Sequence, residues 1–193
     1  MKKLSYLIFS LFLISCNSDD TEFSNPEFVD AVTGRYVLEE AYTEVAIDLT
    51  MDGVAHIDLF QWDNYCNGSY IFESFYLTIV QQNYAIIGFH LPRSGNDMNG
   101  NQSHCVRDGH SFYNIFIDEH SETVKIADSE NGNVEGNSHY DNFLYEQFHA
   151  KMVDFSWADG VGHVILDIDF YRADGVWEEA RVHLKYHKYS NRV

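Results

Sequence analysis

Three short segments of the chain each place an Asp-Gly dipeptide between stretches in which apolar and polar residues alternate. The segments are Met51-Asp52-Gly53-Val54, Ala158-Asp159-Gly160-Val161 and Ala173-Asp174-Gly175-Val176. Asp-Gly supplies the positive φ angles that tight hairpin turns need, and alternation of period two is typical of a strand with one buried face. The pattern therefore predicts hairpins, and successive hairpins make an antiparallel meander.

The alternating stretches identify the side chains that we expect to face a core. They are Val45, Ile47 and Leu49; Ala55, Ile57 and Leu59; Val164, Leu166, Ile168 and Phe170; and Val182, Leu184 and Tyr186. No segment shows a long pattern of period 3.6. We expect an all-β fold of about eight to ten strands, and a meander of that size normally closes into a barrel or folds into a two-sheet sandwich.

Three other stretches complete the expected organisation. A short helical turn is predicted near the N-terminus, where Ser24 or Asn25 can cap it and Pro26 suits its first position. Phe28 and Val32 are four residues apart and would face the domain together. The segments 92–110 and 127–142 are rich in Gly, Asn and other polar residues, and they are predicted to interrupt the meander as long loops.

The first sixteen residues have the pattern of an export signal. Lys2 and Lys3 are followed by a mostly apolar run and then by small Ser15. The sequence Leu13-Ile14-Ser15-Cys16 resembles the lipobox of bacterial lipoproteins, in which the signal is cut before the Cys and the Cys is lipidated. The resemblance implies a signal peptide over residues 1–15, a lipidated acidic tether over 16–31 and one β domain over 32–193. The alternative is an ordinary secretory signal that leaves Cys16 unmodified.

Lipidation of Cys16 would make the membrane a partner without a spanning segment, because each buried methylene contributes about 0.8 kcal/mol and two acyl chains anchor stably. Ser18-Asp19-Asp20 resembles the acidic signal that sends some lipoproteins of Bacteroidota to the cell surface. The alternative for this segment is a plain spacer. The expected location is the cell envelope, as an outer-membrane lipoprotein, with exposure at the cell surface and a periplasmic orientation as the two alternatives.

The charge of the chain excludes one class of partner. The net charge of −18 becomes −20 when Lys2 and Lys3 are removed with the signal, and such a field repels nucleic acid. The remaining cysteines, Cys66 and Cys105, are one possible disulfide pair outside the cytoplasm, where it would close a loop of about 40 residues and contribute roughly 3–4 kcal/mol. Two free thiols are the alternative.

Several segments together resemble the lipocalin-like lipoproteins of Bacteroidota. They are Val32-Thr33-Gly34-Arg35-Tyr36-Val37-Leu38, Ile47-Asp48-Leu49-Thr50-Met51-Asp52-Gly53, Cys66-Asn67-Gly68-Ser69-Tyr70-Ile71-Phe72 and the closing segment 182–189. The chain departs from that group at Tyr36, where Trp is usual. The resemblance implies a β-barrel that binds a small molecule or a partner, and it transfers no site residue.

The sequence contains no motif of a catalytic, metal or cofactor site. No Cys-x-x-Cys, His-Glu-x-x-His or Gly-x-Ser-x-Gly spacing occurs. His183 and His187 share a strand face with Lys185, whose charge opposes a cation. An irregular calcium site in Asp128-Ser129-Glu130-Asn131-Gly132-Asn133 stays open beside its interpretation as a solvated turn.

Four aromatic residues near predicted strand ends are the candidate ligand-binding residues, with core packing as the alternative. They are Trp62, Tyr65, Trp157 and Trp177. The leading hypothesis is a monomeric, non-enzymatic, lipid-anchored protein that binds a small apolar ligand or an envelope partner. The alternative is a surface module that binds glycans through exposed aromatics, with or without calcium. A hollow barrel would favour the small ligand, a flat aromatic row a glycan, and a filled barrel a protein partner or a structural role.

Overall fold

The computed structural model describes residues 23–62, 65–66, 76–81, 85–96, 101–128 and 136–192. The signal, Cys16 and most of the predicted tether lie outside the described residues, as do residues 129–133 of the calcium candidate.

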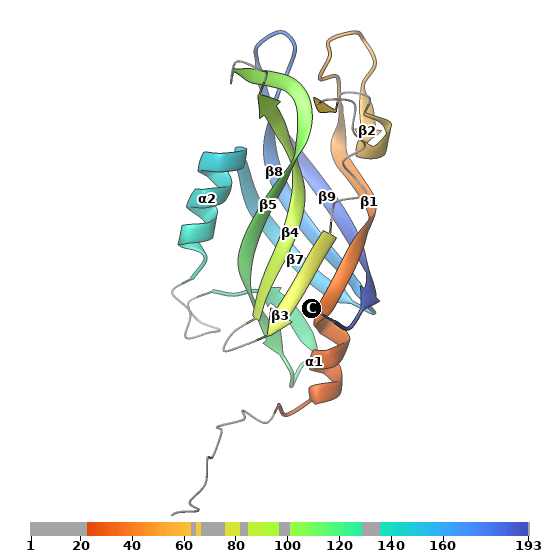
Figure 1. Ribbon diagram of the computed structural model, residues 1–193, viewed down its shortest axis with the longest axis vertical. Coiled ribbons are helices and arrows are strands. Elements are labelled where there is room, and N and C mark those ends of the chain that lie inside the picture. Colours follow the sequence, from red (N-terminus) through yellow and green to blue (C-terminus); the bar gives the residue numbers. More distant parts are fainter. Residues whose placement is uncertain are drawn as a thin grey trace, which may run out of the picture.

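The described residues form one antiparallel sheet of nine strands, confirming the all-β prediction (Figure 1). Its strands are β1 (Gly34–Ile47), β2 (His56–Asp58), β3 (Tyr76–Gln81), β4 (Ala85–Asn96), β5 (Gln102–Asp118), β6 (Thr123–Ile126), β7 (Ala150–Ala158), β8 (Val161–Tyr171) and β9 (Trp177–Ser190). The helices are α1 (Pro26–Val32), the 3-10 helix η1 (Leu59–Gln61) and α2 (Ser138–Phe148).

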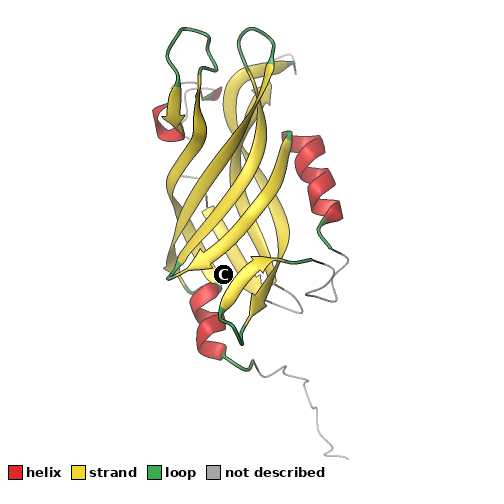
Figure 2. Cartoon of the chain, turned by 180° about the vertical axis from the view of Figure 1, so that it is seen from behind, coloured by secondary structure: helices red, strands yellow, loops and turns green. Residues whose placement is uncertain are grey.

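The sheet curls into a nearly closed barrel. The strand order is β6-β5-β4-β3-β1-β9-β8-β7, so that the first long strand joins the two halves, while β2 pairs only with β1. The end strands β6 and β7 lie against each other, and α2 packs on β5 and β7 along the same seam. Figure 2 shows α2 outside the barrel wall and α1 at the lower end.

All three Asp-Gly segments form turns between antiparallel neighbours. Asp159 and Gly160 have φ angles of 49° and 79° and join β7 to β8 directly, which is the geometry of a two-residue hairpin. The Asp174-Gly175 turn joins β8 to β9, and the Asp52-Gly53 turn lies in a longer connection between β1 and β2. The hairpin prediction is confirmed.

The barrel lumen is filled by its own side chains. The predicted inward residues of β8 and β9 alternate as expected and are fully buried. Large aromatic side chains that are at most 1% exposed take up much of the interior; they are Tyr36, Phe89, Phe155, Phe170 and Tyr186. An eight-stranded barrel is just wide enough to be filled in this way.

The segment 92–110 does not form the predicted loop. Apart from residues 97–101 it belongs to β4 and β5, which pair as a long ribbon from Ala85↔Ile115 to Asn96↔Gln102. Pro92 is tolerated because β3 pairs with β4 only as far as Phe89, so no ladder bond from β3 is lost. The polar composition misled the prediction, because only Val106 among the described residues of this segment joins the core.

The segment 127–142 was also predicted as a loop, and no helix was expected there, yet its last residues begin α2. Only Leu144 of this helix is buried, so the sequence carries no apolar stripe of period 3.6. Val45 and Ile57 were expected to face the core and are instead 70% and 49% exposed. The pairing of β1 with β2 shifts register between Tyr42 and Ile47, which breaks the strict alternation.

Helix α1 covers the lower end of the barrel, confirming the predicted helical turn. The Asn25 side chain accepts a hydrogen bond from Phe28 N at 3.0 Å, and Pro26 occupies the first turn. Phe28 and Val32 are buried in the core, as expected. At the other end of the helix, Lys188 Nζ donates to the carbonyls of Asp30 and Ala31, where a cation complements the helix dipole.

Candidate functional site

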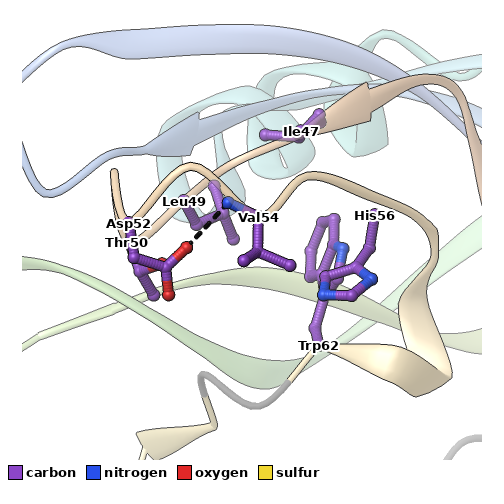
Figure 3. A pocket seen from close by; sticks show the side chains of 7 residues that line it. All are labelled: Ile47, Leu49, Thr50, Asp52, Val54, His56 and Trp62. Atoms are coloured by element: carbon purple, nitrogen blue, oxygen red, sulfur yellow. Dashed lines mark hydrogen bonds between the residues drawn. The ribbon is translucent and has the colours of Figure 1, made fainter.

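A pocket lies at the barrel end opposite α1, which we call the mouth pocket. Its volume is about 140 Å³, and it is lined by Ile47, Leu49, Thr50, Asp52, Val54, His56 and Trp62. Figure 3 shows that these side chains come from the end of β1, the connection after it, β2 and the residue that follows η1. Ile47, Leu49 and Trp62 are buried, whereas Thr50, Asp52 and Val54 are exposed. The pocket therefore has an apolar floor and a largely polar rim.

The rim is ordered by hydrogen bonds to one carboxylate. Asp48 accepts from Gly53 N at 2.7 Å, from Asp52 N at 3.3 Å and from Thr50 Oγ1 at 3.3 Å. Partial desolvation acts to raise the pKa of Asp48, but these hydrogen bonds outweigh it and hold that pKa below its ordinary value. Asp52 in turn accepts from Val54 N at 2.9 Å (Figure 3). Asp48 thus fixes the loop from which the rim residues project.

The same loop is attached to the β8–β9 turn. Ala173 N donates to Leu49 O at 2.9 Å, and Arg172 Nη2 contacts Met51 Sδ at 2.9 Å. Arg172 is itself held by Asp174 and Glu178, at 2.7 and 2.9 Å. These two connections stand side by side at the upper end of Figure 1. The pocket is therefore part of the barrel end and not of a detached loop.

Trp62 gives the pocket its distinctive chemistry. Its ring packs edge-on against Phe170, with ring centroids 5.1 Å apart, and the residue is only 4% exposed. Its indole Nε1–H is buried and has no hydrogen-bond partner within the described part of the molecule. A buried donor without an acceptor is unfavourable by about 1–3 kcal/mol, so this group favours a ligand that brings an acceptor.

The size of the pocket limits what it can hold. An apolar cavity of about 150 Å³ in another protein binds a single benzene molecule. A volume of about 140 Å³ therefore suits one six-membered ring or a group of similar size. The rim offers the Thr50 hydroxyl, the Asp52 carboxylate and the His56 imidazole to polar substituents.

The structure does not bring the four candidate aromatics together in one row. Tyr65 folds around the same segment as Trp62, because both donate to Leu59 O, through the hydroxyl and the backbone N–H respectively. Trp157 lies at the α1 end, where its Nε1 donates to Tyr36 Oη at 2.8 Å and its ring meets Phe28 edge-on. Only Trp62 lines the mouth pocket.

Trp177 belongs to a separate aromatic cluster. Its ring stacks on His149 with centroids 4.3 Å apart and lies 5.2 Å from Tyr171. His149 has a φ of 50° and ends α2, so this cluster attaches the helix to the start of β9.

Cys66 and Cys105 form a disulfide with their Cα atoms 5.0 Å apart, as predicted. Next to it, Tyr65 forms an isolated bridge with Val106. The disulfide ties the segment after η1 to the upper part of β5. It lies just beyond Trp62 in the sequence and so helps to hold that residue against the barrel.

Two histidines lie next to each other on the outer wall, away from the mouth pocket. His183 Nδ1 lies 3.2 Å from His163 Nε2, and His183 Nε2 lies 3.1 Å from Glu44. Desolvation, followed by the charges of His183 and Lys185, lowers the pKa of His163. Among the described residues, no group of three or more His, Cys, Asp or Glu side chains is placed to hold a metal ion.

Comparisons of the chain with models of protein families, with curated proteins and with solved structures found no match. In the described ranges, no helix has both the length and the apolar character needed to cross a membrane. By architecture, the chain is a nearly closed antiparallel β-barrel with a filled lumen and a small pocket at one mouth.

The sequence pointed to Trp62 but not to the residues around it. Asp48, Thr50 and His56 look like ordinary members of alternating strands, and their convergence depends on a loop that returns over the barrel end. A usable signal was present in Asp48-Leu49-Thr50-Met51-Asp52-Gly53, because an acid five residues before a turn glycine can accept from its backbone.

Proposed function

We propose that the protein is a non-enzymatic, lipid-anchored binding protein of the cell envelope that holds a small ligand in the mouth pocket. The ligand is a ring-sized, largely apolar group that carries a hydrogen-bond acceptor. One observation carries the proposal: Trp62 lines a pocket with an apolar floor, and its buried indole N–H has no acceptor among the described residues. The filled lumen was the criterion that favours a protein partner or a structural role, and it leaves no place for a ligand inside the barrel. The small-ligand proposal therefore depends on the mouth pocket alone.

The position of the pocket fits attachment through Cys16. The described chain begins beside α1, at the lower end of the barrel in Figure 1, while the mouth pocket lies at the other end. Ten residues separate Cys16 from Pro26, and a fully extended segment of that length spans roughly 35 Å. A lipid at Cys16 would therefore place α1 toward the membrane and the mouth toward the solution.

The first experiment compares two probes of nearly equal shape. Cyclohexanone carries a carbonyl acceptor, and methylenecyclohexane replaces that oxygen with a CH₂ group. Ligand-observed NMR with the full chain should show saturable binding of both probes, with cyclohexanone preferred by about fivefold because one hydrogen bond contributes about 1 kcal/mol. Trp62→Phe removes the donor and should abolish the preference.

A matched pair of tryptophan substitutions locates the site. Val54 lines the pocket and is 54% exposed, whereas Val45 is 70% exposed and lies outside it. Val54→Trp should block both probes, and Val45→Trp should leave their binding unchanged. Equal binding by the two variants would refute the proposed site.

Native mass spectrometry of the protein from its own envelope then identifies the physiological ligand. A bound compound with an apolar ring and an acceptor supports the proposal. If the bound compound is a sugar, and its binding is lost in Val54→Trp, the glycan alternative would replace the proposal of an apolar ligand. A protein without ligand across several preparations, together with the absence of probe binding, would contradict the small-ligand function.

A further inference from the structure

A second hollow lies on the outer face of the barrel wall, away from the mouth pocket, and we call it the wall groove. It has a volume of about 320 Å³ and crosses β3, β4 and β5, with a lining of Tyr76, Thr78, Val80, Ile86, Gly88, His110 and Phe112. Tyr76 and Phe112 are 42% and 46% exposed, so both rings present apolar surface to the groove. A cavity of this volume is in the range that binds small molecules.

The groove exists because Gly88 has no side chain. Gly88 pairs with Phe112 on one side and Thr78 on the other, so all three positions share the outer face. A Cβ atom at Gly88 would lie 3.2 Å from Phe112 Cε1 and 3.5 Å from His110 Nε2. Those two side chains therefore lean over the floor at Gly88 and make a wall of the groove.

The two long walls differ in character. On one side, the rings of Tyr76 and His90 lie 4.0 Å apart, and those of His90 and His110 lie 4.6 Å apart. His90 is fixed by Asp108, whose carboxylate oxygens lie 2.8 Å from its Nδ1. On the other side stand Val80 and Ile86, which pair with each other. A flat apolar body fits between an aromatic and an aliphatic wall.

The end of the groove at β1 is cationic. Arg35 pairs directly with Thr78 and is exposed. In contrast to Arg172 and Arg181, which are bound by carboxylates, Arg35 has no ion-pair partner among the described residues. The row Phe112, Gly88, Thr78, Arg35 thus runs from an aromatic end to a guanidinium across four strands. At about 4.8 Å per strand, Arg35 lies roughly 10 Å from Gly88.

We propose that the wall groove is a second binding site, for a small aromatic anion whose rings lie over Gly88 and whose anionic group reaches toward Thr78 and Arg35. A guanidinium binds a carboxylate or sulfonate through charge-assisted hydrogen bonds. In a chain with a net charge of −18, an arginine without a carboxylate partner beside an apolar groove is the complement of such a ligand.

The groove also offers a neutral hydrogen-bonding group. Desolvation, followed by the charge of His90, lowers the pKa of His110, so its imidazole is uncharged near neutral pH. His90, the other imidazole of this wall, lies against the Asp108 carboxylate, so the cation of the groove without a carboxylate partner in the described part of the chain is Arg35. This position of the cation orients the ligand.

Two fluorescent probes with similar ring systems test the site. 1-Anilinonaphthalene-8-sulfonate carries an anionic group, and N-phenyl-1-naphthylamine is its uncharged counterpart. Both are titrated into the full chain in buffer without detergent or lipid. Both probes should bind. Arg35→Gln should lower the affinity for the sulfonate by about tenfold or more, while the affinity for the amine should change by less than about twofold.

Three further variants make the result specific. Gly88→Leu fills the floor and should abolish binding of both probes. Lys151→Gln makes the same change of net charge on β7, and Val54→Trp blocks the mouth pocket, so both should bind both probes as the unmodified chain does. The unfolding midpoint of each variant, measured by circular dichroism, confirms that the barrel is intact.

Several outcomes would overturn this second site. One is failure of the unmodified chain to bind the sulfonate, and another is unchanged binding by folded Gly88→Leu. An equal loss of affinity for both probes in Arg35→Gln would also refute it, because the guanidinium would then have no specific role in binding the anion. Loss of sulfonate binding in Val54→Trp would also overturn the proposal, because it would show that the probe binds in the mouth pocket and not in the wall groove.

Discussion

The hydrogen bond between Trp157 and Tyr36 is expected to couple helix α1 to the barrel. Trp157 Nε1 donates to Tyr36 Oη at 2.8 Å, and the same hydroxyl donates to Val32 O in the last turn of α1. Tyr36 is fully buried, and its burial raises the pKa of the hydroxyl well above the ordinary value. Tyr36→Phe leaves two polar groups without this partner. Because Trp157 is only partly buried and can reach water, the variant should lose about 1–2 kcal/mol of the free energy of unfolding.

A double-mutant cycle isolates the contribution of this bond. Trp157→Phe should lose about 1–3 kcal/mol, since it removes both the donor and part of a ring that packs on Phe28. The double variant should be less destabilised than the sum by about 1 kcal/mol. Equilibrium unfolding in urea, followed by far-ultraviolet circular dichroism, measures all four proteins. Additivity within about 0.3 kcal/mol would show that the hydroxyl does not connect the helix to the wall.

Three further perturbations test the turns, the disulfide and the rim. Reducing the Cys66–Cys105 bond, which spans a sequence separation of 39, should lower the free energy of unfolding by about 4 kcal/mol in the chain-entropy model, and unfolding curves with and without reductant measure this. Gly160→Ala places a side chain at a φ of 79° and should lower the free energy of unfolding by about 1 kcal/mol. An alanine variant of an exposed residue with negative φ is the control and should show no such loss. The pKa of Asp48 in the folded protein lies below its ordinary value of 3.8, so its stabilisation of the rim is present above about pH 4 and is lost as the pH falls through the folded pKa. The protection of Gly53 N against hydrogen exchange, taken relative to the intrinsic exchange rate at each pH, should fall over that lower range in the unmodified chain, and Asp48→Asn should show no such dependence on pH.

The sequence predicted those parts of the fold that depend on local chemistry. The Asp-Gly turns and the alternation in β8 and β9 were correct because each is determined by neighbours in the chain. Asn25 and Pro26 identified α1 for the same reason. The ribbon of β4 and β5 was missed because few of its residues between 92 and 110 are apolar, and only the register of the two strands shows that they form a sheet. Helix α2 was missed because it buries Leu144 alone and leaves no apolar stripe.

The mouth pocket was predictable only in part. Trp62 could be chosen from its position near a strand end, but its unpartnered N–H depends on packing against Phe170, more than a hundred residues away in the chain. The wall groove left no signal that the sequence could reveal. Gly88 looks like any glycine in a strand, and its importance follows from the placement of Phe112 and His110 on the adjacent strand.

The filled lumen explains why both proposed sites lie outside the barrel interior. Tyr36, Phe89, Phe155, Phe170 and Tyr186 all point inward, and Tyr186 even places its hydroxyl inside, where it donates to His90 O at 2.5 Å. Replacing several of these residues would be needed to open a cavity of ligand size, and each large-to-small change would lose about 3–5 kcal/mol. A barrel of marginal stability cannot lose that much several times over. Binding sites on this scaffold must therefore lie outside the lumen, under a loop folded over the mouth or over a glycine on the outer face.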